Sequence, residues 1–214
     1  GSGKTPLMNM LSGIYFPDEG QIYIHDKPVT IASPKDAFAL GIGMIHQHFK
    51  LVDLFTATEN IILGLEGKLD LNHARQKVKE ICDKYGFDID PDMKIYDMSV
   101  SQKQTGESVK VLYRGADILI LDEPTAVLTP QEIDELMEIM RSLTKEGKSI
   151  LFISHKLNEI MAVADRVTVL RKGRYVGTVN TCDTNKQELS NMMVGRPVQL
   201  QVVKEPSQPR HLSL

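Results

Sequence analysis

The stretch Ile118-Leu119-Ile120-Leu121-Asp122-Glu123-Pro124 decides the fold class. A continuous apolar run that ends in acidic residues is typical of a central parallel strand, because helices cover both faces of such a strand. Ligands of open parallel sheets bind beyond the carboxyl ends of the strands. Adjacent side chains of a strand point apart. We therefore expect Asp122 to hold Mg²⁺ through water and Glu123 to polarise an attacking water.

Strand signals recur on both sides of this stretch. Segment 21–26 alternates apolar and polar residues, 42–45 is a short apolar strand, and 149–153 reads as a second buried strand. Alternating segments flank Lys172-Gly173, which predicts a hairpin. Helix signals lie between the strands, so the chain is expected to form an α/β core with a mostly parallel sheet.

Capping residues mark where the helices begin. Ser33 precedes a proline and an acid, and the pairs Thr56–Glu59 and Thr129–Glu132 have the spacing of capping boxes. Each motif satisfies backbone N–H groups that the first helical turn leaves without partners. Helices are therefore predicted to start at these three places.

The middle of the chain is mostly helical. A helix over 72–85 that ends at Gly86 lies within segment 56–114, which predicts a helical subdomain inserted into the α/β core. We assign residues 1–195 to one domain. Residues 196–214, where prolines lie among polar residues, are expected to form a linker or tail.

The chain begins with Gly1-Ser2-Gly3-Lys4-Thr5, the second half of the phosphate-binding pattern G-x-x-x-x-G-K-[ST]. The glycines let backbone N–H groups turn toward phosphates, Lys4 would reach the β- and γ-phosphates, and the Thr5 hydroxyl would bind Mg²⁺. An ordinary glycine-rich turn before a helix fits the same residues. Pro6 removes an N–H group from the first helical turn, so we expect nucleotide affinity to be weaker by roughly 1.5–3 kcal/mol.

No initiator Met precedes this half-motif. We expect the chain to enter its domain partway through the phosphate loop. The first loop glycine and the central strand before it would then be absent, and the two strands that flank that strand would lose their ladder and core contacts.

Two further polar residues follow predicted strands. Gln47 comes directly after strand 42–45, where a neutral amide can touch both Mg²⁺ and water. His155 follows strand 149–153, where it could contact a γ-phosphate. His46 and His48 flank Gln47, but no third residue has the spacing of a metal ligand, so they predict no metal site of their own.

These motifs together resemble the ordered set of ABC-type ATPases: Walker A, Q-loop, signature, Walker B and H-loop. Around Gln47 and around Glu123 the sequence is most similar to ATP-binding subunits of nucleoside or simple-sugar importers, which usually carry two cassettes in one chain. This chain resembles the first of the two. The resemblance rests on Lys4-Thr5, Gln47, Ser99-Val100-Ser101-Gln102, Leu121-Asp122-Glu123-Pro124 and Ser154-His155, and on segments 41–64 and 117–129.

The resemblance implies a RecA-like P-loop NTPase core whose ATP hydrolysis energises an importer. Two cassettes would sandwich ATP, each phosphate loop facing the partner's signature, here Ser99 to Gln102. Glu123 would be the general base, Gln47 would contact Mg²⁺ and water, and His155 would orient the γ-phosphate. Membrane permease subunits would be direct partners and an extracytoplasmic substrate-binding protein an indirect one. The chain would lie at the cytoplasmic face of the membrane.

Two residues depart from the family pattern near the signature. Ser101 stands where the family usually has Gly, and its side chain would crowd a γ-phosphate. Gly106 falls inside the helix that should follow, at a cost of about 1 kcal/mol relative to Ala. A degenerate cassette that binds nucleotide without turnover is therefore an alternative function.

Composition limits the remaining function classes. The chain has 214 residues, of which 42% are hydrophobic, and its formal net charge is −3. The acidic balance gives no general attraction to nucleic acid. It therefore disfavours a third alternative, a soluble ABC ATPase that acts on nucleic acid or the ribosome. No apolar run approaches the roughly 18–20 residues that span a bilayer, and the two cysteines are expected to be free thiols.

Overall fold

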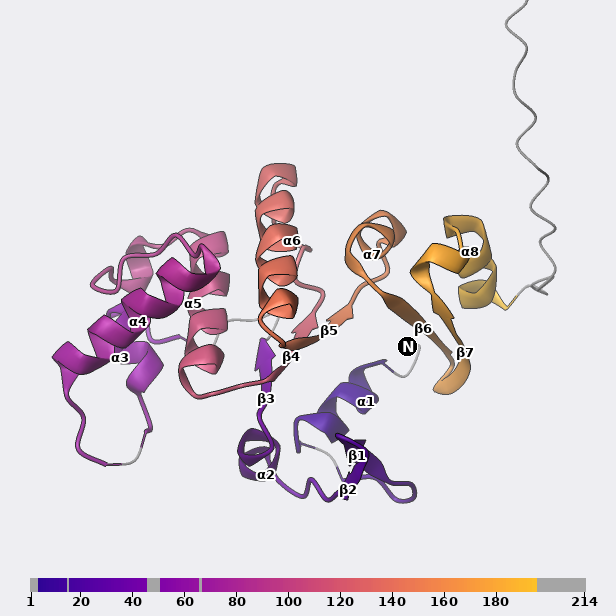
Figure 1. Ribbon diagram of the computed structural model, residues 1–214, viewed down its shortest axis with the longest axis horizontal. Coiled ribbons are helices and arrows are strands. Elements are labelled where there is room, and N and C mark those ends of the chain that lie inside the picture. The colour runs from indigo at the N-terminus through magenta and orange to yellow at the C-terminus, as the bar shows by residue number, and fades with distance from the viewer. Residues whose placement is uncertain (1–3, 15, 46–50, 66, 196–214) are drawn as a thin grey trace, which may run out of the picture.

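The computed structural model describes residues 4–14, 16–45, 51–65 and 67–195, without the side chain of Thr5. At its centre is a parallel sheet in which β4 (Ile118–Asp122) lies between β3 (Ile42–Ile45) and β5 (Ser149–Ile153) (Figure 1). Ile118 pairs with Ile42 on one side and with Ser149 on the other. The three strands therefore end at the same edge, as expected for a nucleotide-binding α/β fold.

Burial confirms the central place of β4 and corrects the expectation for β5. Leu119, Ile120 and Leu121 are at most 2% exposed. In β5 the prediction of a buried strand was wrong: Leu151 is 41% exposed, and only Ile153 is buried. Among the described residues β5 pairs with β4 alone. Its other edge therefore lacks a neighbouring strand that would cover it.

The predicted helix starts are confirmed. Ser33 Oγ accepts the Asp36 N–H, and the Thr56 and Thr129 boxes are both reciprocal. Gly86, with φ +76°, ends the helix predicted over 72–85. The α-helices are α1 (Lys4–Leu11), α2 (Pro34–Ala39), α3 (Ala57–Ile62), α4 (Leu71–Tyr85), α5 (Val100–Tyr113), α6 (Pro130–Lys145), α7 (Leu157–Val163) and α8 (Lys186–Val194). Short 3-10 helices η1 (Ile95–Asp97) and η2 (Thr181–Asp183) join them.

Two hairpins complete the fold. One consists of β1 (Ile22–Ile24) and β2 (Lys27–Val29), and the other of β6 (Arg166–Arg171) and β7 (Arg174–Asn180). The predicted turn at Lys172-Gly173 is confirmed, and both residues have positive φ, +50° and +75°. That is the geometry of a type I′ turn, whose twist matches that of the flanking strands.

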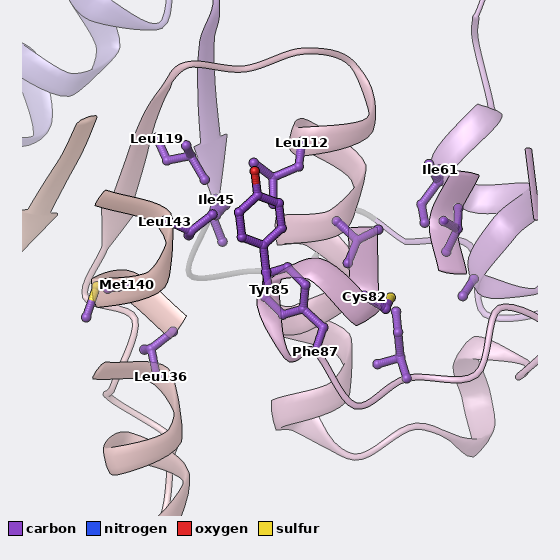
Figure 2. Packing of buried hydrophobic residues seen from close by; sticks show 14 of the residues in the cluster. Ile45, Ile61, Cys82, Tyr85, Phe87, Leu112, Leu119, Leu136, Met140 and Leu143 are labelled. Carbon is purple, nitrogen blue, oxygen red and sulfur yellow. The ribbon is translucent and has the colours of Figure 1, made fainter. Parts of the chain in front are cut away.

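The helices of segment 56–114 share their core with the sheet. One cluster joins Ile45 and Leu119 of the sheet with Cys82 of α4, Leu112 of α5 and Met140 of α6. Figure 2 shows these side chains converging between the helices. The helical character of the segment is confirmed, while its boundaries as a subdomain and those of the 1–195 domain stay predictions. Residues 196–214 lie outside the described residues.

The two cysteines are free thiols, as predicted, and differ sharply in exposure. Cys82 is buried in α4, and burial raises the pKa of its thiol to about 11. At pH 8 only about one part in a thousand of such a thiol is thiolate. We therefore expect a disulfide reagent to modify exposed Cys182 quickly and Cys82 at least about 100-fold more slowly. Cys182→Ser should leave a chain that reacts only after denaturation. Rapid reaction of Cys82 in that variant would contradict the burial of its side chain.

No described helix is both long enough and apolar enough to cross a membrane.

Candidate active site

Glu123 leaves β4 with an unusual backbone conformation. Its φ is +46°, in the left-handed region that a residue with a side chain seldom adopts. Such a conformation costs about 1–3 kcal/mol and persists where surrounding contacts hold it. One of these contacts is a backbone hydrogen bond, in which Glu123 N–H donates to Ile153 O at 2.9 Å. Asp122, by contrast, is still in the strand and pairs with Ile153. The two adjacent acids therefore occupy different settings, as their different predicted roles require.

Three distant parts of the chain meet at the Glu123 carboxylate. Lys4 Nζ lies 3.7 Å from Glu123 Oε1, and His155 Nδ1 lies 3.1 Å from the same oxygen. The three side chains are partly open to solvent, with Glu123 the least exposed at 20%. Partly exposed pairs of this kind contribute at most about 1 kcal/mol to stability. These contacts therefore add little to the stability of the fold, and a chemical role explains their convergence better.

The lysine of the predicted phosphate loop, Lys4, lies at the start of a helix. Lys4 is the first residue of α1, so its side chain extends from the positive end of that helix to Glu123. Pro6 is exposed in the first turn, where helix geometry tolerates proline. Gly1, Ser2 and Gly3 lie outside the described residues.

The donors for Mg²⁺ are described only in part. Asp122 is half-buried at the carboxyl end of β4, whereas the Thr5 side chain and Gln47 lie outside what the structure describes. Magnesium is usually held by one or two carboxylates together with substrate phosphates. A single half-buried carboxylate such as Asp122, at the end of a parallel strand, fits that donor set. No cluster of three or more His, Cys, Asp or Glu side chains suited to a metal occurs among the described residues.

The predicted signature residues form the N-terminal cap of α5. Ser99 Oγ accepts the Gln102 N–H at 3.1 Å, and Gln102 Oε1 accepts the Ser99 N–H at 3.0 Å. Both residues line a cleft of about 600 Å³ between α5 and α6. Figure 1 shows α5 well separated from α1. Within one chain the signature and Lys4 are thus not brought together.

Ser101 has a partner on α6. Hydrogen bonds from the Thr129 backbone, the Thr129 hydroxyl and the Ser101 hydroxyl hold the pKa of Glu132 below its ordinary value. Ser101 and Glu132 line the same cleft. The residue that departs from the family pattern therefore contacts the first turn of a neighbouring helix.

Gln104 is a residue of this site that the sequence reasoning missed. It is buried in α5, and its Nε2 donates to Pro124 O at 2.6 Å. It thereby ties the signature helix to the residue that follows Glu123. The sequence carries no signal for this contact, because glutamine side chains are mostly exposed and no local pattern marks this one as buried.

Comparison with known proteins decides the family. The family described as "ABC transporter" matches residues 1–126, which is more than half of the chain. The chain belongs to the ABC transporter family. The resemblance inferred from the motif order is thereby confirmed, and the likeness extends to proteins of known role.

Two relatives of this ABC chain are equally similar to it. It is 55% identical to the nucleoside import ATP-binding protein NupA of Lactococcus lactis subsp. cremoris over 218 residues, 100% of this chain and 43% of the relative. It is 55% identical to the guanosine import ATP-binding protein NupO of Bacillus subtilis, over 98% of this chain and 42% of the relative. A third relative, the glucose import ATP-binding protein TsgD13 of Haloferax volcanii, is 44% identical over 96% of this chain and 43% of the relative. The chain thus spans less than half the length of these relatives.

Solved structures confirm the fold of the ABC chain. CbiO1 from Clostridium perfringens, part of the ABC transporter complex CbiONQ, superposes with a TM-score of 0.73 and 26% identity, over 95% of this chain and 81% of that one. An ATP-binding cassette of an ABC transporter in its ADP conformation superposes with a TM-score of 0.75 and 23% identity. The match covers 92% of this chain and 82% of that one. The predicted P-loop NTPase fold is therefore correct.

Proposed function

We propose that the chain binds and hydrolyses ATP as one cassette of an importer for nucleosides. The observation that carries the proposal is the convergence of Lys4 and His155 on the Glu123 carboxylate, at the shared edge where β4 and β5 end. A cation, a carboxylate and an imidazole at the carboxyl ends of parallel strands suit phosphoryl transfer to water.

Each residue would have one task in the reaction. Lys4 would leave Glu123 for the phosphates of ATP, and the carboxylate would then accept a proton from the attacking water. The water oxygen would bond to the γ-phosphorus as the bond to the ADP oxygen breaks. His155, 3.1 Å from Glu123, would orient the γ-phosphate. Mg²⁺, held by Asp122, Thr5 and Gln47, would supply neutralisation of the charge that develops on the phosphate oxygens.

The separation of the signature from Lys4 supports a site shared between two cassettes. In such a pair Ser99 to Gln102 would meet the γ-phosphate bound by the partner, which is a second copy or a second cassette of a longer chain. Membrane permease subunits would receive the resulting motion, and an extracytoplasmic binding protein would deliver substrate to them. The chain would thus lie at the cytoplasmic face of the membrane. Its net charge gives no reason to expect nucleic acid as a partner.

The substrate class rests on the names of the two relatives at 55% identity, which point to nucleosides ahead of simple sugars. A chimera tests whether the chain works as a cassette in a nucleoside importer. We would replace the matching segment of NupO by this chain and measure guanosine uptake in Bacillus subtilis. Uptake close to that of intact NupO is expected. A chimera that is made in normal amount but imports no guanosine would contradict the proposal, and the Glu123→Gln chimera is the negative control.

The presence of Ser101 where the family usually has Gly favours a second candidate, a cassette that binds nucleotide without turnover. Calorimetry with Mg-ATP, followed by measurement of phosphate release, separates the two. Binding with turnover supports the ATPase, and tight binding with no phosphate release supports the second candidate.

Removal of the Ser101 side chain should raise ATP turnover. Ser101→Gly clears the space that a γ-phosphate needs, so we expect a several-fold gain in kcat, at a stability cost of at most about 1 kcal/mol. Ser101→Ala loses the contact with Glu132 but keeps Cβ, and it should not reproduce the gain. Equal gains in both variants would show that the contact with Glu132, not crowding, limits turnover.

A further inference from the structure

The loop that follows β4 is hydrogen-bonded to α7. Thr125, two residues after Glu123, is 1% exposed. Its Oγ1 donates to Glu159 Oε2 at 2.6 Å, and the Glu159 side chain is only 12% exposed. A short hydrogen bond to a shielded carboxylate is roughly twice as strong as one between neutral groups. This contact is therefore a firm link between the β4 loop and the first turn of α7.

Lys156 contacts both residues of this link. Its Nζ lies 3.9 Å from Glu159 Oε1 and donates to Thr125 O at 3.4 Å. Its backbone N–H donates to Ser154 Oγ at 3.0 Å, which fixes the turn between β5 and α7. Both the hydroxyl and the carbonyl of Thr125 thus have partners next to His155.

The link joins the two segments that carry Glu123 and His155, because Thr125 follows Glu123 by two residues and Lys156 follows His155 directly. His155 directly precedes Lys156, the N-cap residue of α7, and Glu159 lies in the first turn of that helix. Glu123 keeps its left-handed φ of +46° only where neighbouring contacts hold it. On the catalytic side those contacts are the His155–Glu123 contact and the Glu123 N–H bond to Ile153 O. The bond from Thr125 to Glu159 adds support two residues further along the loop.

A simpler role for Glu159 is an acid in the first turn of α7, which stabilises a helix without any partner. That role does not require the carboxylate to be shielded or to accept a hydrogen bond of 2.6 Å from a residue 34 positions earlier. The geometry therefore favours a tertiary role.

We propose that Thr125 and Glu159 are positioning residues that hold Glu123 and His155 in register for ATP hydrolysis. The proposal rests on the proposed function. Neither residue acts on the phosphate itself. Their effect passes through the distance between the Glu123 carboxylate and the His155 ring.

Steady-state kinetics of conservative variants test the link. Thr125→Val removes the hydroxyl at constant shape, and we expect kcat for ATP to fall about 10- to 100-fold while KM stays within about twofold. Thr125→Ser restores the donor and should return to within about twofold of the original chain. Glu159→Ala should match Thr125→Val, and the double variant should be no slower than either, because both remove one interaction. Thr144→Val, on the exposed face of α6, is the matched control.

Ring signals of His155 keep this result separate from the proposed function. If the original chain hydrolyses no ATP, the proposed function fails, and the ¹⁵N signals of the His155 ring still decide the positioning role. Thr125→Val and Glu159→Gln should both shift those signals, whereas Thr125→Ser and Thr144→Val should not. Unchanged signals, or normal kcat in a folded Thr125→Val chain, would overturn the proposal. Thermal unfolding checks folding, and Glu159→Gln replaces any variant that does not fold.

Discussion

Glu123→Gln is expected to lower ATP turnover by about 10²–10⁴-fold, because an amide cannot accept the proton of the attacking water. The change keeps the size of the side chain and still offers an oxygen to His155 Nδ1 and Lys4 Nζ. Binding of Mg-ATP should therefore persist. Phosphate release and calorimetry, measured on the same samples, check both parts of the expectation.

Glu80→Gln is the matched control, because Glu80 is exposed on α4 and does not line the cleft of the signature residues. It should leave turnover unchanged. Normal phosphate release from the Glu123→Gln chain would remove Glu123 from the reaction. Another acid would then have to serve as general base.

Lys4→Ala is expected to weaken ATP binding about 10- to 150-fold, since hydrogen bonds to charged groups are worth about 1.5–3 kcal/mol. The loss should be larger for ATP than for AMP, because the side chain is expected to reach the β- and γ-phosphates. Titration of both nucleotides by calorimetry measures the difference directly.

Lys79→Ala, an exposed lysine of α4, is the control for the change in net charge. It should bind ATP as the original chain does. Equal loss of AMP and ATP affinity in Lys4→Ala would mean that Lys4 acts through general charge. The phosphate-loop assignment would then be wrong.

Much of the site could be predicted from sequence because its residues follow strong local patterns. An apolar run that ends in Asp122-Glu123 predicts both a central strand and its functional edge, and the structure confirms the strand. The phosphate-loop pattern predicted Lys4, the end of strand 149–153 predicted His155, and the structure brings both to Glu123. The predicted roles of all these residues stay predictions, and Gln47, the Thr5 side chain and the first glycines lie outside what the structure describes.

Other features depend on which loops lie side by side, and no local pattern encodes that. The links from Gln104 to Pro124 and from Glu159 to Thr125 join positions 20 and 34 residues apart. The exposure of Leu151 depends in the same way on which strands pair with β5. Periodicity specifies which face of an element is apolar, but not which neighbour will cover it.

The core that the helices share with the sheet has a consequence for how the chain unfolds. Leu112 of α5 and Met140 of α6 lie in one cluster with Leu119 of the sheet. Helices α3 to α5 cannot separate from the sheet without exposing these side chains to water, at about 1.5–3 kcal/mol for each. Melting of α4 and α5 is therefore expected to coincide with melting of β4, in one cooperative transition.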